Sequence, residues 1–161
     1  MMDKKSYIAW IRGLVGDAKI ILNAACVVIP NDKGEILLQK RSDNRKWGLP
    51  GGLLELDEPI ADGAIREVRE ETNLDVEIAG FVGVFVNPSM TWRKKDKAEV
   101  ICHSFVGRVV GGQLRINDDE SLGFDWFTLA NLPEIHSSDN LETIRAYFAG
   151  ERNLVEGRRY S

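Results

Sequence analysis

Three glutamates, Glu67, Glu70 and Glu71, lie three and four positions apart in the segment REVREETNL. Residues at this spacing share one face of an α-helix, so their carboxylates would lie side by side. Such a group repels itself unless a cation lies among the carboxylates, and hard oxygen ligands favour Mg²⁺, Mn²⁺ or Ca²⁺. A solvated acidic face is the alternative interpretation, because exposed glutamates are common in helices.

Two features of the flanking sequence favour a ligand site. The opposite helix face is apolar, so the glutamates must point outward or into a cleft. The sequence LPGG at 49–52 precedes the helix, and paired glycines let backbone approach a ligand and leave carbonyl oxygens free to bind metal. Magnesium prefers few carboxylates together with water and substrate phosphate, so we expect a phosphate-bearing substrate. The apolar residues are Ile60, Ala64, Ile65 and Val68.

The segment from Gly52 to Leu74 resembles the Nudix box, GX5EX7REUXEEXGU, in which U is aliphatic. The departure is Asn73, where the family has glycine. Asparagine tolerates the left-handed conformation better than most residues, so we expect slight strain at the helix end and an unaffected metal site. The likeness extends over roughly residues 20–133, through ILLQKRSDNRKWGLPGG and ESLGFDWFTLANLP. The matching box residues are Gly52, Glu58, Arg66, Glu67, Val68, Glu70, Glu71 and Leu74.

The resemblance implies a role for each polar residue of the box. It implies Mg²⁺, for which Mn²⁺ can substitute, bound by carboxylates and by the backbone carbonyl of Gly51. Arg66 would pair with a box carboxylate and hold its rotamer. Glu58 would support the loop or a metal-bound water, and Gly52 is a structural residue of the box. The metal-binding carboxylates of the box would be Glu67, Glu70 and Glu71.

Two residues outside the box are further candidates. Glu120 stands six residues before Trp126, and some Nudix hydrolases resemble this in having there a glutamate that adds a ligand or a base. The box carboxylates all approach from one helix, so a group on the far side must come from another element. Arg41, at the end of its strand, could contact a substrate phosphate. We expect Asp118 to matter much less than Glu120, and a solvated acidic turn is the alternative for this segment.

The function implied by the resemblance is hydrolysis of a nucleoside diphosphate linked to another group, with Glu67, Glu70 or Glu120 as the general base. Nucleoside triphosphates, ADP-ribose, nucleotide sugars and dinucleoside polyphosphates are all open as substrates. A nucleotide-sensing Nudix module is one alternative, and isoprenoid diphosphate isomerase-like chemistry is another. The second needs a suitably placed cysteine, whereas Cys26 and Cys102 lie inside apolar runs.

Helical periodicity predicts three helices around this chemistry. The box helix starts with Pro59 in its first turn and ends at Asn73, a suitable left-handed C′ residue. His136 precedes the last helix and is expected at the surface. The helices span about 6–15, 59–72 and a segment that begins after Ser137 or Ser138 and ends before Gly150.

The β-rich runs complete the predicted fold. Runs 21–30 and 35–41 flank the turn NDKG and predict a hairpin. Because these runs alternate with helices, we predict an α+β fold, a Nudix-type α/β/α sandwich with a mixed sheet. A frayed tail is expected over 151–161. The other β-rich runs are near 76–87, 97–110 and 124–129.

Length and charge set the remaining expectations. The 161 residues predict one domain over 1–161, and the net charge of −4 provides no basic surface for nucleic acid. No apolar run reaches the roughly 18 residues of a membrane span, and the N-terminus lacks a secretion signal. Two cysteines without metal or disulfide spacing are typical of buried thiols in a reducing compartment. We therefore expect a cytoplasmic protein with a small-molecule partner, and a homodimer is open.

Overall fold

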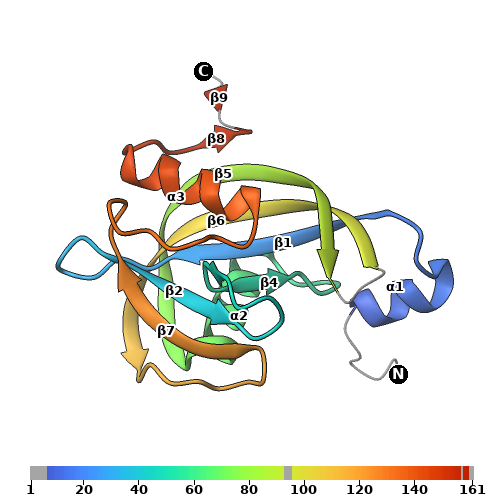
Figure 1. The fold of residues 1–161 in the computed structure, drawn as a ribbon, viewed down its shortest axis with the longest axis horizontal. Helices are drawn as coiled ribbons and strands as arrows, with labels where there is room; N and C mark the ends of the chain where they lie inside the picture. Colours follow the sequence, from blue (N-terminus) through green and yellow to red (C-terminus); the bar gives the residue numbers. More distant parts are fainter. Residues whose placement is uncertain (1–6, 93–95, 157, 160–161) are drawn as a thin grey trace.

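The computed structural model describes residues 7–92, 96–156 and 158–159 (Figure 1). It confirms the α+β fold, with helices on both sides of a mixed sheet. None of the helices in these ranges is long and apolar enough to cross a membrane. The helices are α1 (Tyr7–Val15), α2 (Ile60–Thr72) and α3 (Ser138–Phe148).

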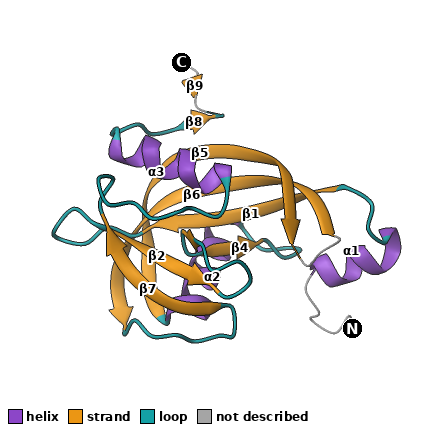
Figure 2. Cartoon of the chain, in the orientation of Figure 1, coloured by secondary structure: helices purple, strands orange, loops and turns teal. Residues whose placement is uncertain are grey.

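The described strands form two sheets (Figure 2). The larger has the order β4-β1-β6-β5-β8-β9, in which β1 and β6 are parallel and β5 and β6 antiparallel. The smaller has the order β3-β2-β7. The strands are β1 (Ile20–Val28), β2 (Ile36–Arg41), β3 (Trp47–Gly48), β4 (Gly51–Leu53), β5 (Leu74–Trp92), β6 (Asp96–Gly112), β7 (Ser121–Phe127), β8 (Leu154–Val155) and β9 (Arg158–Arg159).

Both faces of β1 are buried in its second half, from Ala25 to Val28, which explains the continuous apolar sequence there. Successive side chains of a strand point to opposite faces. On one face, Ala25 and Val27 share a core with Ala64 and Val68 of α2. The other face packs under α3, so the sheet lies between the two helices (Figure 1). The core residues on that second face include Cys26, Val28, Leu38, Cys102 and Ile144.

The hairpin predicted from the NDKG turn is confirmed only next to the turn, where Pro30 and Ile36 form an antiparallel bridge and the amide of Leu37 donates to the carbonyl of Ile29. Beyond that bridge, β1 and β2 separate into different sheets. The reason is that β1 is paired along its whole length with β6, and on its other side with β4. β2 therefore pairs with β3 and β7 instead, which carries Arg41 toward the connection that precedes β7.

The tail predicted to fray over 151–161 is ordered in its first half, so that expectation is wrong there. Leu154 is 2% exposed and pairs with Gly83 of β5 in a parallel register. Leu154 fills the core beside α3, and the amides of Asn153 and Glu156 donate to carbonyls of β5, so both packing and pairing hold this segment. A single apolar residue in a polar run leaves no periodic signal in the sequence. Residues 157 and 160–161 lie outside the described part of the chain, as does residue 6 of the predicted first helix.

Candidate active site

Helix α2 carries the candidate carboxylates and ends where the sequence predicts. Pro59 is its N-cap residue, one position before the helical turn that was expected to contain it. Asn73 has a φ of 64°, the left-handed conformation, and its amide donates to the carbonyl of Arg69. The helix therefore stops at Asn73, and the chain turns directly into β5.

The two glycines of β4 allow close packing between the loop, β1 and α2. A side chain at Gly51 would collide with the carbonyl oxygen of Ala25, and a Cβ at Gly52 would lie 2.5 Å from Oε2 of Glu67. The amide of Gly51 donates to Oε2 of Glu71 over 3.1 Å. The contact of Gly51 with a box carboxylate thus uses its amide, whereas the predicted metal ligand is its carbonyl.

Arg66 holds three carboxylates in what we call the arginine network, formed by Glu58, Arg66, Glu67 and Glu70. Its guanidinium donates to both carboxylate oxygens of Glu58, over 2.9 and 2.7 Å. It also donates to Glu67 over 3.0 Å and to Glu70 over 3.1 Å. The hydrogen bond from Arg66 lowers the pKa of Glu58 despite partial burial. The negative charge of this network therefore has an internal counterion.

A second cluster, which we call the acidic group, consists of Glu71, Asp118 and Glu120. One carboxylate oxygen from each lies within 4.8 Å of the others. Glu71 is buried, with only 4% of its surface exposed, whereas Asp118 is half-buried. Burial, followed by the charge of Glu67, raises the pKa of Glu71 well above its usual value. Within the described ranges, no arginine or lysine forms an ion pair with this group.

Glu67 connects the two clusters electrostatically. Its side chain is 15% exposed, and burial raises its pKa to about 7 although Arg66 acts in the opposite direction. The charges of Glu70 and Glu120 add to the upward shift. Glu67 is thus bonded to the arginine network while it lies within the field of the acidic group.

The connection between β6 and β7 delivers Asp118 and Glu120, and it is fixed by its own hydrogen bonds. Oδ1 of Asp118 accepts from the amide of Glu120 over 3.1 Å and from the hydroxyl of Ser121 over 3.0 Å. The amide of Ser42 donates to the carbonyl of Glu120 over 2.8 Å. Gln39 of β2 also donates to Ser121. The position of Glu120 is therefore fixed jointly by residues at the end of β2 and at the start of β7.

Arg41 lies at the last position of β2, opposite Ser121 in the register of the smaller sheet. Asp43 holds its guanidinium through two hydrogen bonds of 3.0 and 2.8 Å. Glu71 and Glu120 are near enough to act on the Arg41 charge, although neither forms an ion pair with it. Arg41 therefore stands beside the acidic group with its guanidinium already oriented by Asp43.

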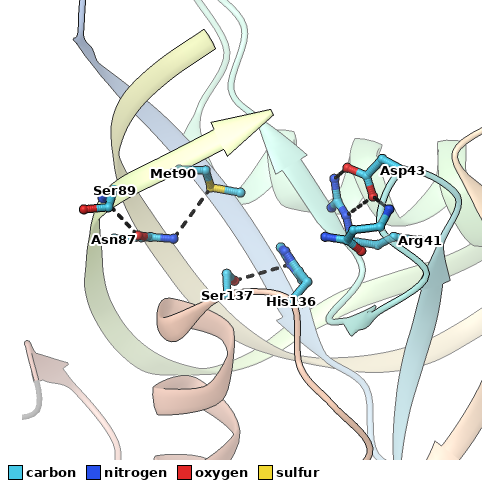
Figure 3. Close-up of a pocket in the computed structure, with 8 residues that line it drawn as sticks. Arg41, Asp43, Asn87, Ser89, Met90, His136 and Ser137 are labelled. Atoms are coloured by element: carbon cyan, nitrogen blue, oxygen red, sulfur yellow. Dashed lines mark hydrogen bonds and ion pairs between the residues drawn. The ribbon is translucent and has the colours of Figure 1, made fainter. Parts of the chain in front are cut away.

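Arg41 also lines a polar pocket of about 130 Å³, together with Asp43 and His136 (Figure 3). His136 was expected at the surface, but it is half-buried and lines this pocket. Burial, followed by the charge of Arg41, lowers the pKa of His136 to about 4. A side chain at Gly48 would collide with the imidazole, so the glycine makes room for it. The lining residues are Arg41, Asp43, Asn44, Asn87, Ser89, Met90, His136 and Ser137.

The structure therefore brings some of the predicted site residues together and places others apart. It brings Glu120 next to Glu71, from an element 49 positions along the chain, and it turns Glu70 toward Arg66 with 57% of that side chain exposed. Asp118, expected to matter little, is a member of the acidic group. The chain bends at 118–120, where Oδ1 of Asp118 accepts from the amide of Glu120, and a short aspartate that bonds the backbone two residues on is the signal that the sequence offers.

The acidic group fits a divalent cation of the kind that the family resemblance implies. Its donors are hard carboxylate oxygens, which suit Mg²⁺ or Mn²⁺. One of its members, Glu71, is almost fully buried and lacks a cationic partner in the described ranges, and an uncompensated buried charge is strongly unfavourable. A divalent ion held by Glu71, Asp118 and Glu120 would compensate it, and Glu67 and Glu70 are close by on α2.

Comparison with known proteins identifies relatives of the chain. The family model for the NUDIX domain matches residues 21–147. A putative 8-oxo-dGTP diphosphatase of Bacillus subtilis is 33% identical over 109 residues, which is 68% of each chain. An ADP-ribose pyrophosphatase of Methanocaldococcus jannaschii is 34% identical over 116 residues, which is 70% of this chain and 65% of that relative.

Solved structures show the same fold. An ADP-ribose pyrophosphatase from Streptococcus suis has a TM-score of 0.66 and 25% identity, over 83% of this chain and 96% of the other. A MutT protein from Methanosarcina mazei has a TM-score of 0.67 and 26% identity, over 83% and 98%. The family match over residues 21–147 includes the box, strands β2 to β7 and all but the first residue of β1, whereas β8 and β9 lie beyond it.

Proposed function

The chain belongs to the Nudix family of hydrolases, which act on pyrophosphate bonds, and on this premise we propose that it cleaves the phosphoanhydride bond of a nucleoside diphosphate linked to another group. The proposed cofactor is Mg²⁺, with Mn²⁺ as a substitute. The observation that supports the proposal is the acidic group, in which buried Glu71 meets Asp118 and Glu120 from another element.

The proposed metal would be held by Glu71, Asp118 and Glu120, with Glu67 and Glu70 as further carboxylates from the same helix. When bound, a divalent ion polarises phosphate oxygens and stabilises the leaving phosphate. Arg66 keeps Glu67 near this position, because its guanidinium bonds Glu67 and is itself fixed by Glu58. The arginine network is therefore a positioning device for the box carboxylates.

Arg41 is the proposed phosphate-binding residue. Asp43 holds its guanidinium in a fixed orientation, and planar guanidinium groups suit phosphate oxygens. Its position between the acidic group and the polar pocket supports a substrate that runs from one to the other. The diphosphate would lie at the acidic group, and one of the attached moieties would enter the pocket beside His136.

The general base is proposed among the carboxylates next to the acidic group. Of the three candidates, Glu70 lies outside the acidic group and is 57% exposed. Glu120 is a member of that group, and its charge raises the pKa of Glu67, so Glu67 lies near it. We propose that one of these two accepts the proton of the attacking water.

Neither alternative function is supported by a specific observation. A module that only senses a nucleotide has no need of catalytic carboxylates, yet every box carboxylate is present. Isomerase-like chemistry needs an accessible cysteine, but Cys26 and Cys102 are buried, with their sulfurs 3.4 Å apart in the core under α3. These buried thiols suit a reducing compartment, so we propose a cytoplasmic location.

A substrate panel tests the proposal. Purified protein is incubated with Mg²⁺ and nucleoside triphosphates, 8-oxo-dGTP, ADP-ribose, nucleotide sugars and dinucleoside polyphosphates, and the products are identified by mass spectrometry. We expect a nucleoside monophosphate from at least one of them. Hydrolysis of 8-oxo-dGTP or ADP-ribose would match the activities of the two relatives. No hydrolysis of any substrate, with Mg²⁺ or Mn²⁺, would overturn the proposal.

A further inference from the structure

The side chain of Asn73 reaches out of the box helix to another segment. Its Nδ2 donates to the carbonyl oxygen of Gln113 over 2.9 Å, a separation of 40 residues along the chain. Its Oδ1 accepts from the guanidinium of Arg115 over 3.5 Å. A glycine, which the family has at this position, would make neither bond. The asparagine is therefore more than a residue that tolerates the left-handed conformation.

Backbone and side-chain contacts extend this connection along the segment 113–117. The amide of Arg115 donates to the carbonyl of Thr72 over 3.1 Å. Asn117 donates through Nδ2 to the carbonyl of Glu70 over 3.1 Å. The last carbonyls of a helix have no partner within the helix itself, so these donors satisfy groups that α2 leaves open. The segment 113–117 thus lies across the C-terminal end of α2.

The same segment leads directly to the acidic group. Asp118 and Glu120 follow Asn117 in the connection between β6 and β7 (Figure 2). Glu71 lies two residues before Asn73 on α2. The two halves of the acidic group are therefore joined through bonds made at the very end of the helix that carries one half.

We propose that the Asn73 side chain holds the segment 113–117 against the end of α2 and thereby positions Asp118 and Glu120 beside Glu71. Asn73 is a positioning residue and makes no contact with the acidic group. The inference rests on the proposed function, because it concerns the metal site that the acidic group would form. It assigns a role to the one position at which this chain departs from the box pattern.

Backbone and side chain make opposite predictions for Asn73→Gly. Glycine adopts positive φ without strain, so the backbone alone predicts equal or greater stability. Loss of the Asn73 side-chain bonds to Gln113 and Arg115, which position two ligands, predicts weaker metal binding, by roughly threefold to tenfold. The variant is thus expected to fold, and any loss of metal affinity reports on the side chain.

The matched control is Asn153→Gly. Asn153 also has a left-handed backbone, with a φ of 58°, but it lies beside β8 and far along the chain from the box. Both substitutions change the same residue type in the same conformation. Asn117→Ala is a second test, because it removes another bond between the segment and α2.

Two measurements test the proposal on substrate-free protein. Mn²⁺ affinity is measured by electron paramagnetic resonance, and amide hydrogen exchange over 113–120 is measured in EDTA. For Asn73→Gly we expect a Kd for Mn²⁺ that is threefold to tenfold higher, and faster exchange over 113–120. Asn117→Ala should change both in the same direction, and Asn153→Gly should change neither.

Wild-type Mn²⁺ affinity in Asn73→Gly would overturn the inference, whatever its exchange rates. An equal loss in Asn153→Gly would also overturn it, because the effect would then come from the backbone. Failure of the proposed function has a different signature. If the acidic group is not the metal site, Glu71→Gln would bind Mn²⁺ as the wild type does. Amide hydrogen exchange over 113–120 in EDTA, compared between wild type and Asn73→Gly, would still show whether Asn73 holds the segment.

Discussion

Helix α2 presents carboxylates to two clusters that differ in one respect. In the arginine network, Arg66 lies among Glu58, Glu67 and Glu70 and donates to all three. In the acidic group, three carboxylates approach one another within 4.8 Å, and the described residues supply no ion-paired cation. Two clusters that both take carboxylates from α2 therefore differ in whether the chain provides the positive charge.

This difference indicates what each cluster is for. The bond from Arg66 lowers the pKa of Glu58, so that carboxylate favours the folded state when it is charged. Burial raises the pKa of Glu71, so its charge opposes folding until a cation arrives. The arginine network is complete in the chain alone, whereas the acidic group needs a ligand. An exposed acidic surface would show neither the burial nor the shift.

The largest effect is expected from Glu71→Gln. Removing the buried anion from the acidic group should lower kcat by at least about 100-fold, because one lost stabilising charge commonly raises the barrier by about 2–4 kcal/mol. Glu70→Gln, on the exposed side of the helix, should lower kcat by about tenfold. Steady-state kinetics with Mg²⁺ measures both. Glu142→Gln, at an exposed position on α3, is the control and should be unchanged.

The arginine network should instead respond through stability. Arg66→Gln leaves Glu58 and Glu67, at 17% and 15% exposure, without their counterion. We expect a loss of about 1–3 kcal/mol in the free energy of unfolding, less than for a fully buried pair. Urea denaturation in EDTA measures it. Arg69→Gln, also on α2, breaks an exposed pair with Asp75 of β5 and should change stability by less than about 0.5 kcal/mol.

Equal, small changes in the free energy of unfolding of Arg66→Gln and Arg69→Gln would contradict the structural role assigned to the arginine network. The arginine network would then be a surface feature with no more weight than an ordinary ion pair.

Within the acidic group, charge and turn geometry can be separated. Glu120→Gln should lower kcat by about tenfold with little change in KM, as expected for a group that acts mainly in the transition state. Asp118→Asn keeps the oxygen that accepts from the amide of Glu120 and from the hydroxyl of Ser121, and it removes only the charge. We therefore expect a smaller loss of kcat, about threefold. The same kinetic assay ranks the two. A larger loss for Asp118 would make it the principal ligand of the connection.

The smallest expected effect is a change in the pH dependence of stability. Because burial raises the pKa of Glu71 in the folded state, this carboxyl binds its proton more tightly in the folded protein than in the unfolded chain, and its contribution to stability falls as the pH rises above about 4.5, the ordinary value. Glu67, with its pKa of about 7, acts in the same direction. His136, whose pKa is lowered from 6.5 to about 4, acts in the opposite direction between those two values. The contribution of Glu71 is therefore the difference between wild type and Glu71→Gln in urea unfolding with EDTA, and wild type should lose more stability, or gain less, as the pH rises from 4.5 toward 7. An identical pH dependence in both proteins would contradict the assignment to Glu71.

Much of this site follows from spacing along the chain. The three-and-four spacing of Glu67, Glu70 and Glu71 gives a common side of α2, and Asn73 ends the helix as expected. The spacing is too coarse to show that Glu71 points inward and Glu70 outward. That division depends on rotation of the helix against β1, which is set by packing of Ala64 and Val68.

The features that were missed depend on contacts between distant segments. The bond from Asn73 to Gln113 joins two places 40 residues apart, and Gln113 belongs to no pattern in the sequence. His136 became half-buried because Gly48, from another element, leaves room for its ring. The NDKG turn predicted a hairpin from local chemistry alone, whereas β6 determined how β1 pairs. Local patterns fix elements, and pairing between them depends on the whole chain.

The central claim is that the acidic group, unlike the arginine network, is a divalent cation site. Isothermal titration calorimetry with Mg²⁺ on substrate-free protein tests it most directly, using wild type, Glu71→Gln and Glu58→Gln. Glu58 lies only in the arginine network, bonded to Arg66. We predict a Kd at least tenfold higher for Glu71→Gln and within about threefold of wild type for Glu58→Gln. Wild-type affinity in Glu71→Gln, or a greater loss in Glu58→Gln, would contradict the account.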